Sequence, residues 1–135
     1  MEKLSTALTN RFPQINRVML AFGPVSPFTL FAMDINPERV SLLQQVDEHV
    51  HRVMEGKMDD FHIWQFPVVL LPTGVDNQQS VVLRPIASTE AMTAHFARID
   101  WEILEPMVKD ILSNHPLSHV FYDLTHKPPG TIEWE

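Results

Sequence analysis

Prolines limit the length of nearly every element that this chain can form. The sequence holds 11 prolines, which stand singly or in pairs between apolar runs and not in one low-complexity tract. Proline fixes φ, lacks an N–H group and holds the residue before it in an extended conformation, so it interrupts helices and central strands. We therefore expect short helices and strands joined by sharp turns.

Three segments have apolar residues at helical spacing, bounded by residues that start or stop helices. The expected helices are Ser5–Arg11, Pro37–Gly56 and Asp100–Asn114. In the second helix, Asn36 can cap the N-terminus, Pro37 fits the first turn and Gly56 is the expected stop. Its predicted apolar stripe consists of Val40, Leu43, Val46, Val50 and Val53.

Five apolar runs are predicted to be strands. They are Ile15–Phe22, Phe28–Met33, Phe66–Pro72, Ser80–Ile86 and Leu117–Leu124. We expect the first two to pair with each other. The third is almost wholly apolar, as a strand buried on both faces would be, and a polar turn links it to the fourth in a predicted hairpin. Ser88–Asp100 shows no clear period and is predicted to be an ordered connection.

These elements predict a single α+β domain at residues 1–124, followed by a tail at residues 125–135. The domain is expected to hold a mostly antiparallel sheet of about five strands, with three helices on one face. A chain of 135 residues is long enough to bury roughly two thirds of its unfolded surface. The alternative is two half-domains, each with its own small sheet, in which the strands at Ile15 and Leu117 belong to different sheets.

The composition excludes several classes of function. There is no cysteine, which rules out disulfides, thiolate zinc sites and cysteine nucleophiles. The formal net charge is −7 and no basic cluster is present, so nucleic acid is not an expected partner. Met1–Ser5 carries an acidic residue and no long apolar run, unlike a signal peptide or membrane span, so we expect a cytoplasmic protein without membrane contact.

No self-contained catalytic or metal-binding machinery can be read from the sequence. Neither a Gly-x-Ser-x-Gly elbow nor a glycine-rich phosphate loop occurs. His49 and His51 are the closest pair among the seven histidines, but residues two apart on a helix point about 200° away from each other and cannot share an ion. We therefore expect no metal and no cofactor.

Arg84 is the basic residue that most needs a partner. It lies at the end of a predicted buried strand, so its guanidinium must reach water or pair with an anion. An intramolecular salt bridge to one of the 17 acidic residues is the simpler interpretation, and a bound anion is the alternative.

The last eleven residues combine stiffness with polar groups. Pro128–Pro129 restricts the chain after Lys127, and Gly130 permits a sharp redirection. Beyond the glycine the residues alternate, with Ile132 and Trp134 as apolar anchors on one side and Thr131, Glu133 and Glu135 on the other. Such a tail suits a small phosphate-bearing ligand. The alternative is that it pairs with a sheet edge and carries no chemistry.

The tail also resembles a known family. Tyr122–Glu135 is similar to the C-terminus of GMP synthetase, which ends in a Tyr-Asp, Ser-Lys-Pro-Pro, Thr-Ile-Glu-Trp-Glu pattern, and His126 stands where that family usually has Ser. Gln65–Pro72, Ser80–Pro85 and Ala91–Ala94 resemble family segments of the same order and spacing. The part before Gln65 has a weaker similarity to the long variant of the family, in which the C-terminal dimerisation domain is doubled.

The resemblance implies a homodimer whose tail contacts the nucleotide XMP. Carried over residue by residue, it implies that Lys127 contacts the XMP phosphate, Glu133 the nucleotide, and Gln65 the phosphate or ribose. Thr131 is implied as an additional donor. A lysine is a point charge suited to phosphate, and a carboxylate can accept from purine N–H groups.

The sequence matches only the last of the three parts of the family's enzyme. It contains neither the glutaminase with its nucleophilic cysteine nor the ATP-pyrophosphatase with its Ser-Gly-Gly-Val-Asp-Ser loop. The resemblance therefore implies a dimerisation and XMP-contacting module of GMP biosynthesis without catalysis of its own. Two alternatives stay open: a subunit of a split enzyme that acts with a separate ATP-pyrophosphatase, and a regulatory or vestigial protein that binds XMP or GMP.

Overall fold

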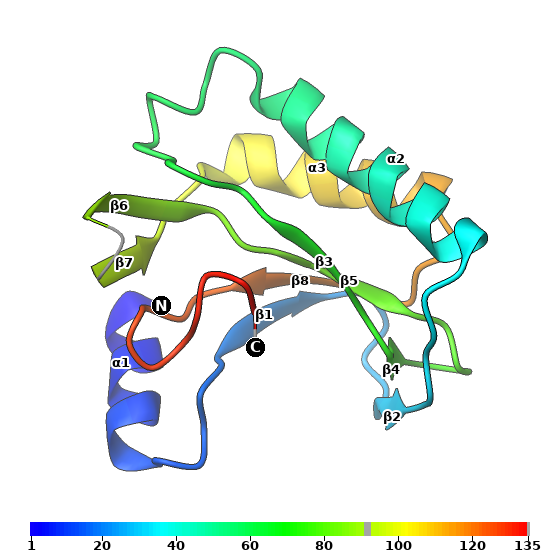
Figure 1. The fold of residues 1–135 in the computed structure, drawn as a ribbon, viewed down its shortest axis with the longest axis horizontal. Helices are drawn as coiled ribbons and strands as arrows, with labels where there is room; N and C mark the ends of the chain where they lie inside the picture. Colours follow the sequence, from blue (N-terminus) through cyan, green and yellow to red (C-terminus); the bar gives the residue numbers. More distant parts are fainter. Residues whose placement is uncertain (91–92, 135) are drawn as a thin grey trace.

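A four-stranded sheet, in the order β1-β8-β5-β3, forms the centre of the molecule (Figure 1). The computed structural model describes residues 1–90 and 93–134. The strands are β1 (Met19–Phe22), β3 (Val68–Leu71), β5 (Ser80–Leu83) and β8 (Val120–Asp123). β1 and β8 pair antiparallel, as do β3 and β5, whereas β5 and β8 are parallel. Because β1 and β8 share one sheet, the alternative of two half-domains is wrong.

The two inner strands are buried along their whole length. Every residue of β5 and β8 is buried, and both strands are rich in β-branched or aromatic residues, which favour extended backbone. The predicted hairpin of β3 and β5 is confirmed. β3 itself was expected to be buried on both faces, but this expectation is wrong, because β3 is an edge strand and all four of its residues are partly exposed.

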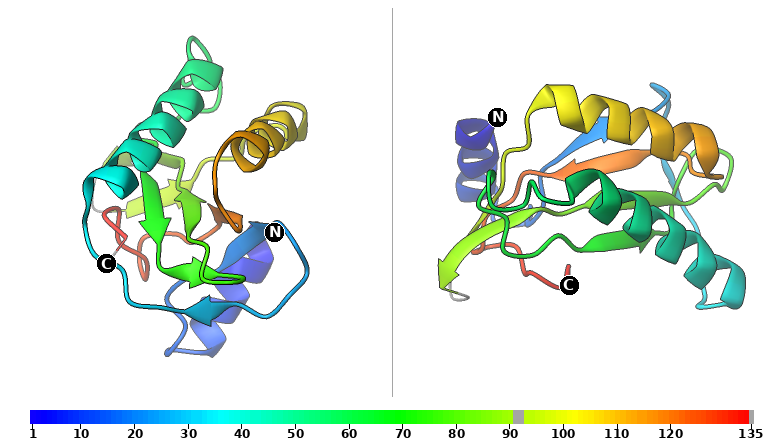
Figure 2. Two further views of the ribbon diagram at one scale, coloured as in Figure 1. Left: turned by 90° about the vertical axis from the view of Figure 1, so that its right-hand side faces the viewer. Right: turned by 90° about the horizontal axis from the view of Figure 1, so that it is seen from above.

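Two helices, α2 (Pro37–Met54) and α3 (Trp101–Asn114), cover one face of this sheet (Figures 1 and 2). The predicted cap of α2 is confirmed, because the side-chain oxygen of Asn36 accepts a hydrogen bond from the Arg39 N–H at 2.9 Å. Gly56, with φ +71°, follows the end of the helix. Among the described residues, no helix is both long enough and apolar enough to span a bilayer.

The buried stripe of α2 differs from the predicted one. It consists of Leu42, Val46, Val50 and Met54, which recur every four residues. Val40, which was expected in the stripe, is 42% exposed. The prediction was wrong there because several apolar residues of this helix fit a helical period, and periodicity alone does not say which of them face the sheet.

The first helix, α1 (Glu2–Arg11), lies apart from α2 and α3, on the other side of the sheet (Figures 1 and 2). The predicted number of helices is confirmed, but only two of the three share one face. Ser5 is the buried residue of α1, whereas Leu4 is 61% exposed. The apolar residues that predicted this helix are therefore mostly exposed: they are Leu4, Ala7, Leu8 and Phe12, of which only Leu8 is partly buried.

Two short ribbons complete the fold. β6 (Ile86–Glu90) and β7 (Thr93–Phe96) pair antiparallel where an ordered connection was expected, so that expectation is wrong. β2 (Thr29–Leu30) pairs with β4 (Thr73–Gly74) and not, as expected, with β1. The described residues thus hold eight strands in three sheets instead of about five in one, while the α+β class with mostly antiparallel pairing is confirmed.

Strand alternation divides the buried residues between the two faces of the central sheet. Val81, Leu83, Val120 and Tyr122 belong to the core beneath α2 and α3. The alternate positions of β8, Phe121 and Asp123, are also buried and point to the other face. This second face receives the C-terminal tail.

Candidate functional site

After β8 the chain turns back and lies along the β6–β7 ribbon. Lys127 and Ala94 form an antiparallel bridge, in which the Lys127 N–H donates to the Ala94 carbonyl at 2.7 Å and the Ala94 N–H donates to the Lys127 carbonyl at 3.2 Å. Ile132 packs with Ile86 and Ala94 in a small buried cluster, so it anchors the tail as predicted. The tail thus combines one residue of edge pairing with an apolar anchor.

A buried carboxylate holds the tail in place. Asp123 is 0% exposed, and its Oδ2 accepts from Arg84 Nη1 at 2.5 Å, from Arg17 Nη1 at 3.1 Å and from the Trp134 indole N–H at 2.7 Å. Its Oδ1 accepts from the Thr125 N–H at 2.8 Å. We call Arg17, Arg84, Asp123 and Trp134 the Asp123 cluster. Two cations and two further donors offset the cost of burying this charge.

The Asp123 cluster answers the question that the sequence raised about Arg84. Arg84 is 1% exposed and forms a salt bridge with Asp123 at 2.5 Å, so the predicted intramolecular pairing is confirmed. A second arginine on the same carboxylate was not expected. The signal that could have suggested it is the Tyr-Asp pair at the end of the last strand, because a buried acid there needs more than one donor.

Arg17 binds both Asp123 and the tail. Both of its terminal nitrogens donate to the Thr131 carbonyl at 3.1 Å, and Nη2 also donates to the Thr131 hydroxyl at 3.0 Å. The guanidinium carbon lies 4.9 Å from the centre of the Trp134 ring, a cation–π distance. Burial and the neighbouring Arg84 lower the pKa of Arg17, and Asp123 opposes this shift.

A glycine is needed at position 130 because the Arg17 side chain lies close to its Cα, and not because the backbone adopts a left-handed conformation. Among the glycines that the structure describes, only Gly23 and Gly56 have positive φ. A Cβ at Gly130 would lie 2.9 Å from Arg17 Nη1 and 3.1 Å from Thr125 Cγ2. The expected redirection is therefore a turn closed by the Gly130 N–H, which donates to the His126 carbonyl at 3.0 Å, and the glycine leaves space for the arginine.

Three of the four predicted site residues lie on the same short tail, whereas the fourth lies elsewhere. Lys127 and Thr131 are half-buried and Glu133 is exposed, all on the tail. Gln65, in contrast, is bridged to Ile86 at the far side of the β6–β7 ribbon. Because both ribbon strands lie between Gln65 and Lys127, three steps of about 4.8 Å put the two backbone segments roughly 14 Å apart. One ligand would have to span the ribbon to contact both.

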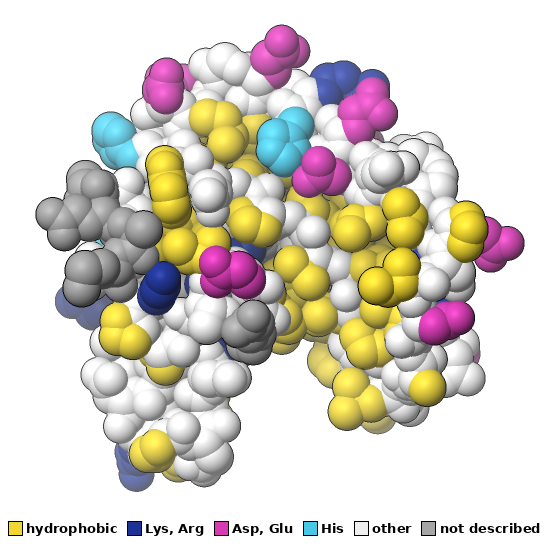
Figure 3. All heavy atoms as spheres, viewed as in Figure 1, with side chains coloured by type: hydrophobic (Ala, Val, Ile, Leu, Met, Phe, Trp, Pro, Cys, Tyr) yellow, Lys and Arg dark blue, Asp and Glu magenta, His cyan; other side chains and the backbone are white. Residues whose placement is uncertain are grey.

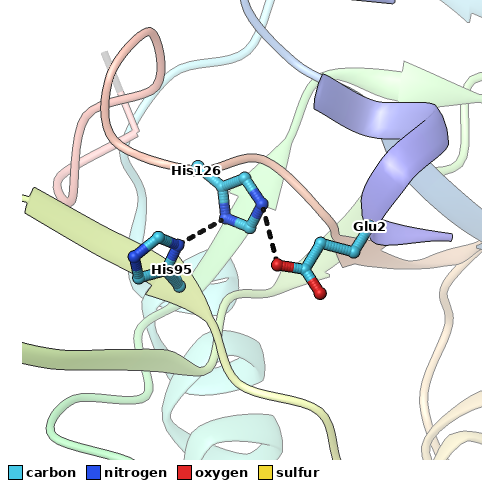
Figure 4. Close-up of side chains that lie close together, drawn as sticks. All are labelled: Glu2, His95 and His126. Carbon is cyan, nitrogen blue, oxygen red and sulfur yellow. Dashed lines mark hydrogen bonds and ion pairs between the residues drawn. The ribbon is translucent and has the colours of Figure 1, made fainter. Parts of the chain in front are cut away.

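A further polar group, which sequence reasoning missed, joins α1, β7 and the tail. Glu2, His95 and His126 point toward one another (Figure 4). His95 Nδ1 lies 3.3 Å from His126 Nδ1, and His126 Nε2 lies 3.6 Å from a Glu2 carboxylate oxygen. Burial and His95 lower the pKa of His126, and Glu2 opposes this shift. The available signal was that His126 replaces the serine usual in the family.

The fold and the site together define a class: an α+β domain whose C-terminal tail folds back on a buried arginine–aspartate cluster. Residues 52–134 match the sequence model of the GMP synthase C-terminal domain. The chain belongs to this family, as the resemblance of its tail implied.

Relatives with assigned names agree with the family. A probable GMP synthase (glutamine-hydrolyzing) from Leptospira interrogans is 41% identical over 142 residues, which cover 100% of this chain and 23% of the relative. GMP synthase (glutamine-hydrolyzing) from Thermosynechococcus vestitus is 38% identical, over 76% of this chain and 21% of the relative. One subunit of the glutamine-hydrolyzing GMP synthase from Thermoplasma volcanium is 37% identical, over 76% of this chain and 36% of the relative. The chain thus spans a minor part of each of these relatives.

Proposed function

We propose that this chain is a module of GMP biosynthesis in the cytoplasm, in which residues 1–124 form a homodimer and the tail at 125–135 contacts XMP. The observation that carries the proposal is the family match over residues 52–134, within which the tail is fixed by the Asp123 cluster. A tail that is already positioned loses little conformational freedom when a ligand binds.

The chemistry of the tail supports contact with a nucleotide monophosphate. Lys127 supplies a cation for the phosphate, and the exposed Glu133 supplies an acceptor for purine N–H groups. Thr131, whose carbonyl and hydroxyl accept from Arg17, adds a hydroxyl between them. Gln65 contacts the same ligand only if the nucleotide extends across the β6–β7 ribbon.

Catalysis belongs, in this proposal, to an ATP-pyrophosphatase that the residues described do not include. The Thermoplasma volcanium relative is named as a subunit, which supports an arrangement in which the domain works with a partner chain. A complete synthase encoded elsewhere in the same genome would remove the reason for a split enzyme. It would favour instead a regulatory or vestigial protein that binds XMP or GMP.

Exposed apolar side chains support the dimer. Val25, Leu30 and Ile35, all in the segment around β2, are 105%, 85% and 92% exposed. Hydrophobic side chains also gather on the face seen in Figure 3, which is hollowed between its two lower lobes. Contiguous apolar surface is typical of association sites. Sedimentation equilibrium at tens of micromolar protein tests this part, and a strict monomer would contradict it.

A titration with XMP tests the nucleotide part. In spectra of ¹⁵N-labelled protein we expect saturable amide shifts at residues 131–134 with a dissociation constant on the order of millimolar. We expect weak affinity because a few side chains on one short tail would enclose only a small part of the ligand's surface. Shifts confined to α2 and α3, on the opposite face of the sheet, would mean that the tail has a purely structural function.

A further inference from the structure

His95 and His126 are cross-strand neighbours. The bridge between Ala94 and Lys127 is a hydrogen-bonded antiparallel pair, so the next pair along, His95 and His126, is a pair without backbone hydrogen bonds. Side chains of such pairs lie especially close. Their imidazole rings are accordingly 4.8 Å apart, in an edge-to-face arrangement.

Packing fixes the orientation of the His126 ring. Its side chain is 16% exposed and stacks on Phe96, with ring centres 5.5 Å apart. The backbone bridge therefore sets the spacing of the two histidines, and stacking on Phe96 fixes the ring of His126. This is how preorganised ligands are held in binding sites.

The spacing of the nitrogens fits one metal ion. Two ligands at about 2.05 Å from a tetrahedral Zn²⁺ are separated by about 3.4 Å. The observed separation of His95 Nδ1 and His126 Nδ1 is 3.3 Å. One potential ligand atom from each of Glu2, His95 and His126 lies within 4.8 Å of the others, the only such group of three among the side chains that the structure describes.

We propose that Glu2, His95 and His126 form a binding site for Zn²⁺ that ties α1 and β7 to the C-terminal tail. Two imidazoles and one carboxylate are ligands that this ion prefers, and three protein ligands leave a fourth position for water. Glu2 now faces the other ring nitrogen of His126, so its exposed side chain must move most to complete the site.

The site is distinct from the nucleotide contacts proposed for the tail. His126 and Lys127 are consecutive in an extended segment, so their side chains point to opposite sides of it. The ion would fix the residue directly before Lys127 without occupying the lysine. Zinc binding is therefore expected whether or not the tail contacts XMP.

Calorimetric titration of the full chain with Zn²⁺ alone tests the site. We expect one ion per chain, and imidazole nitrogen shifts at His95 and His126 in long-range ¹H–¹⁵N spectra. His126→Ser and His95→Asn should each weaken binding by at least about 10- to 100-fold, the loss typical even of residues that only support metal ligands. The matched control is His51→Asn, an exposed histidine of α2 that contacts the Asp47 backbone.

The experiments distinguish a zinc site at these three residues from zinc binding elsewhere and from loss of the fold. Equal zinc affinity in His126→Ser and His51→Asn, or ring shifts at His49 and His115 alone, would overturn the proposal. Glu2→Gln changes an exposed side chain at the end of α1, so it should leave the fold intact while weakening zinc binding severalfold. Parent-like affinity in this variant would overturn the three-ligand site. Circular dichroism of each metal-free variant establishes that a lost site is not a lost fold.

Discussion

The indole N–H of Trp134 donates to Asp123 Oδ2 over 2.7 Å, and this bond ties the tail to the end of β8. The same oxygen accepts from Arg17 and Arg84. Three segments that are distant in the sequence therefore depend on one buried carboxylate, and the position of the proposed nucleotide contacts depends on it too.

Among substitutions in the Asp123 cluster, Asp123→Asn should reduce the free energy of unfolding most. It leaves the buried Arg84 without its anion, which typically costs about 3–5 kcal/mol in the free energy of unfolding. Arg84→Met should cost less, because Asp123 keeps Arg17 and Trp134 as partners. Urea denaturation measures both values. A loss below about 1 kcal/mol for Asp123→Asn would contradict the assignment of Asp123 as the centre of the cluster.

Trp134→Phe should loosen the tail while keeping an aromatic ring near Arg17. We expect a loss of about 1.5–3 kcal/mol in the free energy of unfolding, because the substitution removes one hydrogen bond to a charged group. Amide hydrogen exchange should accelerate at residues 125–134. Trp64→Phe is the control, because Trp64 is 48% exposed and its replacement should change stability by less than about 0.5 kcal/mol.

Lys127→Ala should abolish the amide shifts caused by XMP while leaving the fold intact. The backbone bridge to Ala94 does not need the side chain, and a lysine near the surface contributes about 0–1 kcal/mol to stability. Lys109→Ala removes an equal charge from α3, where Lys109 pairs with Glu105 at 3.0 Å, and should not affect XMP binding. Parent-like XMP affinity in the Lys127 variant would remove the phosphate contact from the proposal.

Arg17→Lys should weaken XMP binding without removing a charge. Lysine can still pair with Asp123, but it cannot reproduce the bonds of two guanidinium nitrogens to the Thr131 carbonyl. We expect faster amide exchange at Thr131 and an XMP affinity reduced by about fivefold to tenfold, or about 1 kcal/mol. Unchanged affinity together with faster exchange would show that XMP does not need a fixed tail.

Acid should destabilise the protein partly through His115. Burial first, and the charge of His49 second, lower the pKa of His115 below the ordinary histidine value of 6.5. Below about pH 6.5 the unfolded chain therefore binds more protons than the folded one, and the free energy of unfolding falls until the pH drops below the folded pKa. His115→Gln should reduce this slope between about pH 7 and 5, measured by urea denaturation at each pH. The pKa of His126 shifts in the same direction, so part of the slope should remain.

Periodicity and caps predicted the elements whose signals are local. α2 and α3 were found because each has several turns of apolar spacing and a recognisable start, Asn36 and Asp100. β6 and β7 were missed because a register shift between Ala87 and Glu90 breaks the alternation that marks a strand. β2 and β4 have two residues each, too few for any pattern to identify the partner.

The residues of the candidate site also divide into those with a local sequence signal and those whose contacts depend on the fold. Lys127, Thr131 and Glu133 were found because they belong to one contiguous motif. The partner of Arg84 could be predicted only as some acidic residue, since its identity depends on the pairing of β5 with β8. His95 and His126 were missed because only the bridge between β7 and the tail makes them neighbours, and Glu2 because it reaches His126 from α1, far away in the sequence.

The position of β8 between β1 and β5 has a consequence for biosynthesis. β8 is inserted between β1 and β5, so neither of these strands can complete its hydrogen bonds before residues 120–123 have been translated. At roughly 5–20 residues per second, a ribosome needs on the order of 10 s to proceed from β1 to β8. During that interval the edges of β1 and β5 that β8 later covers stay unpaired, so we expect chains truncated before β8 to aggregate readily.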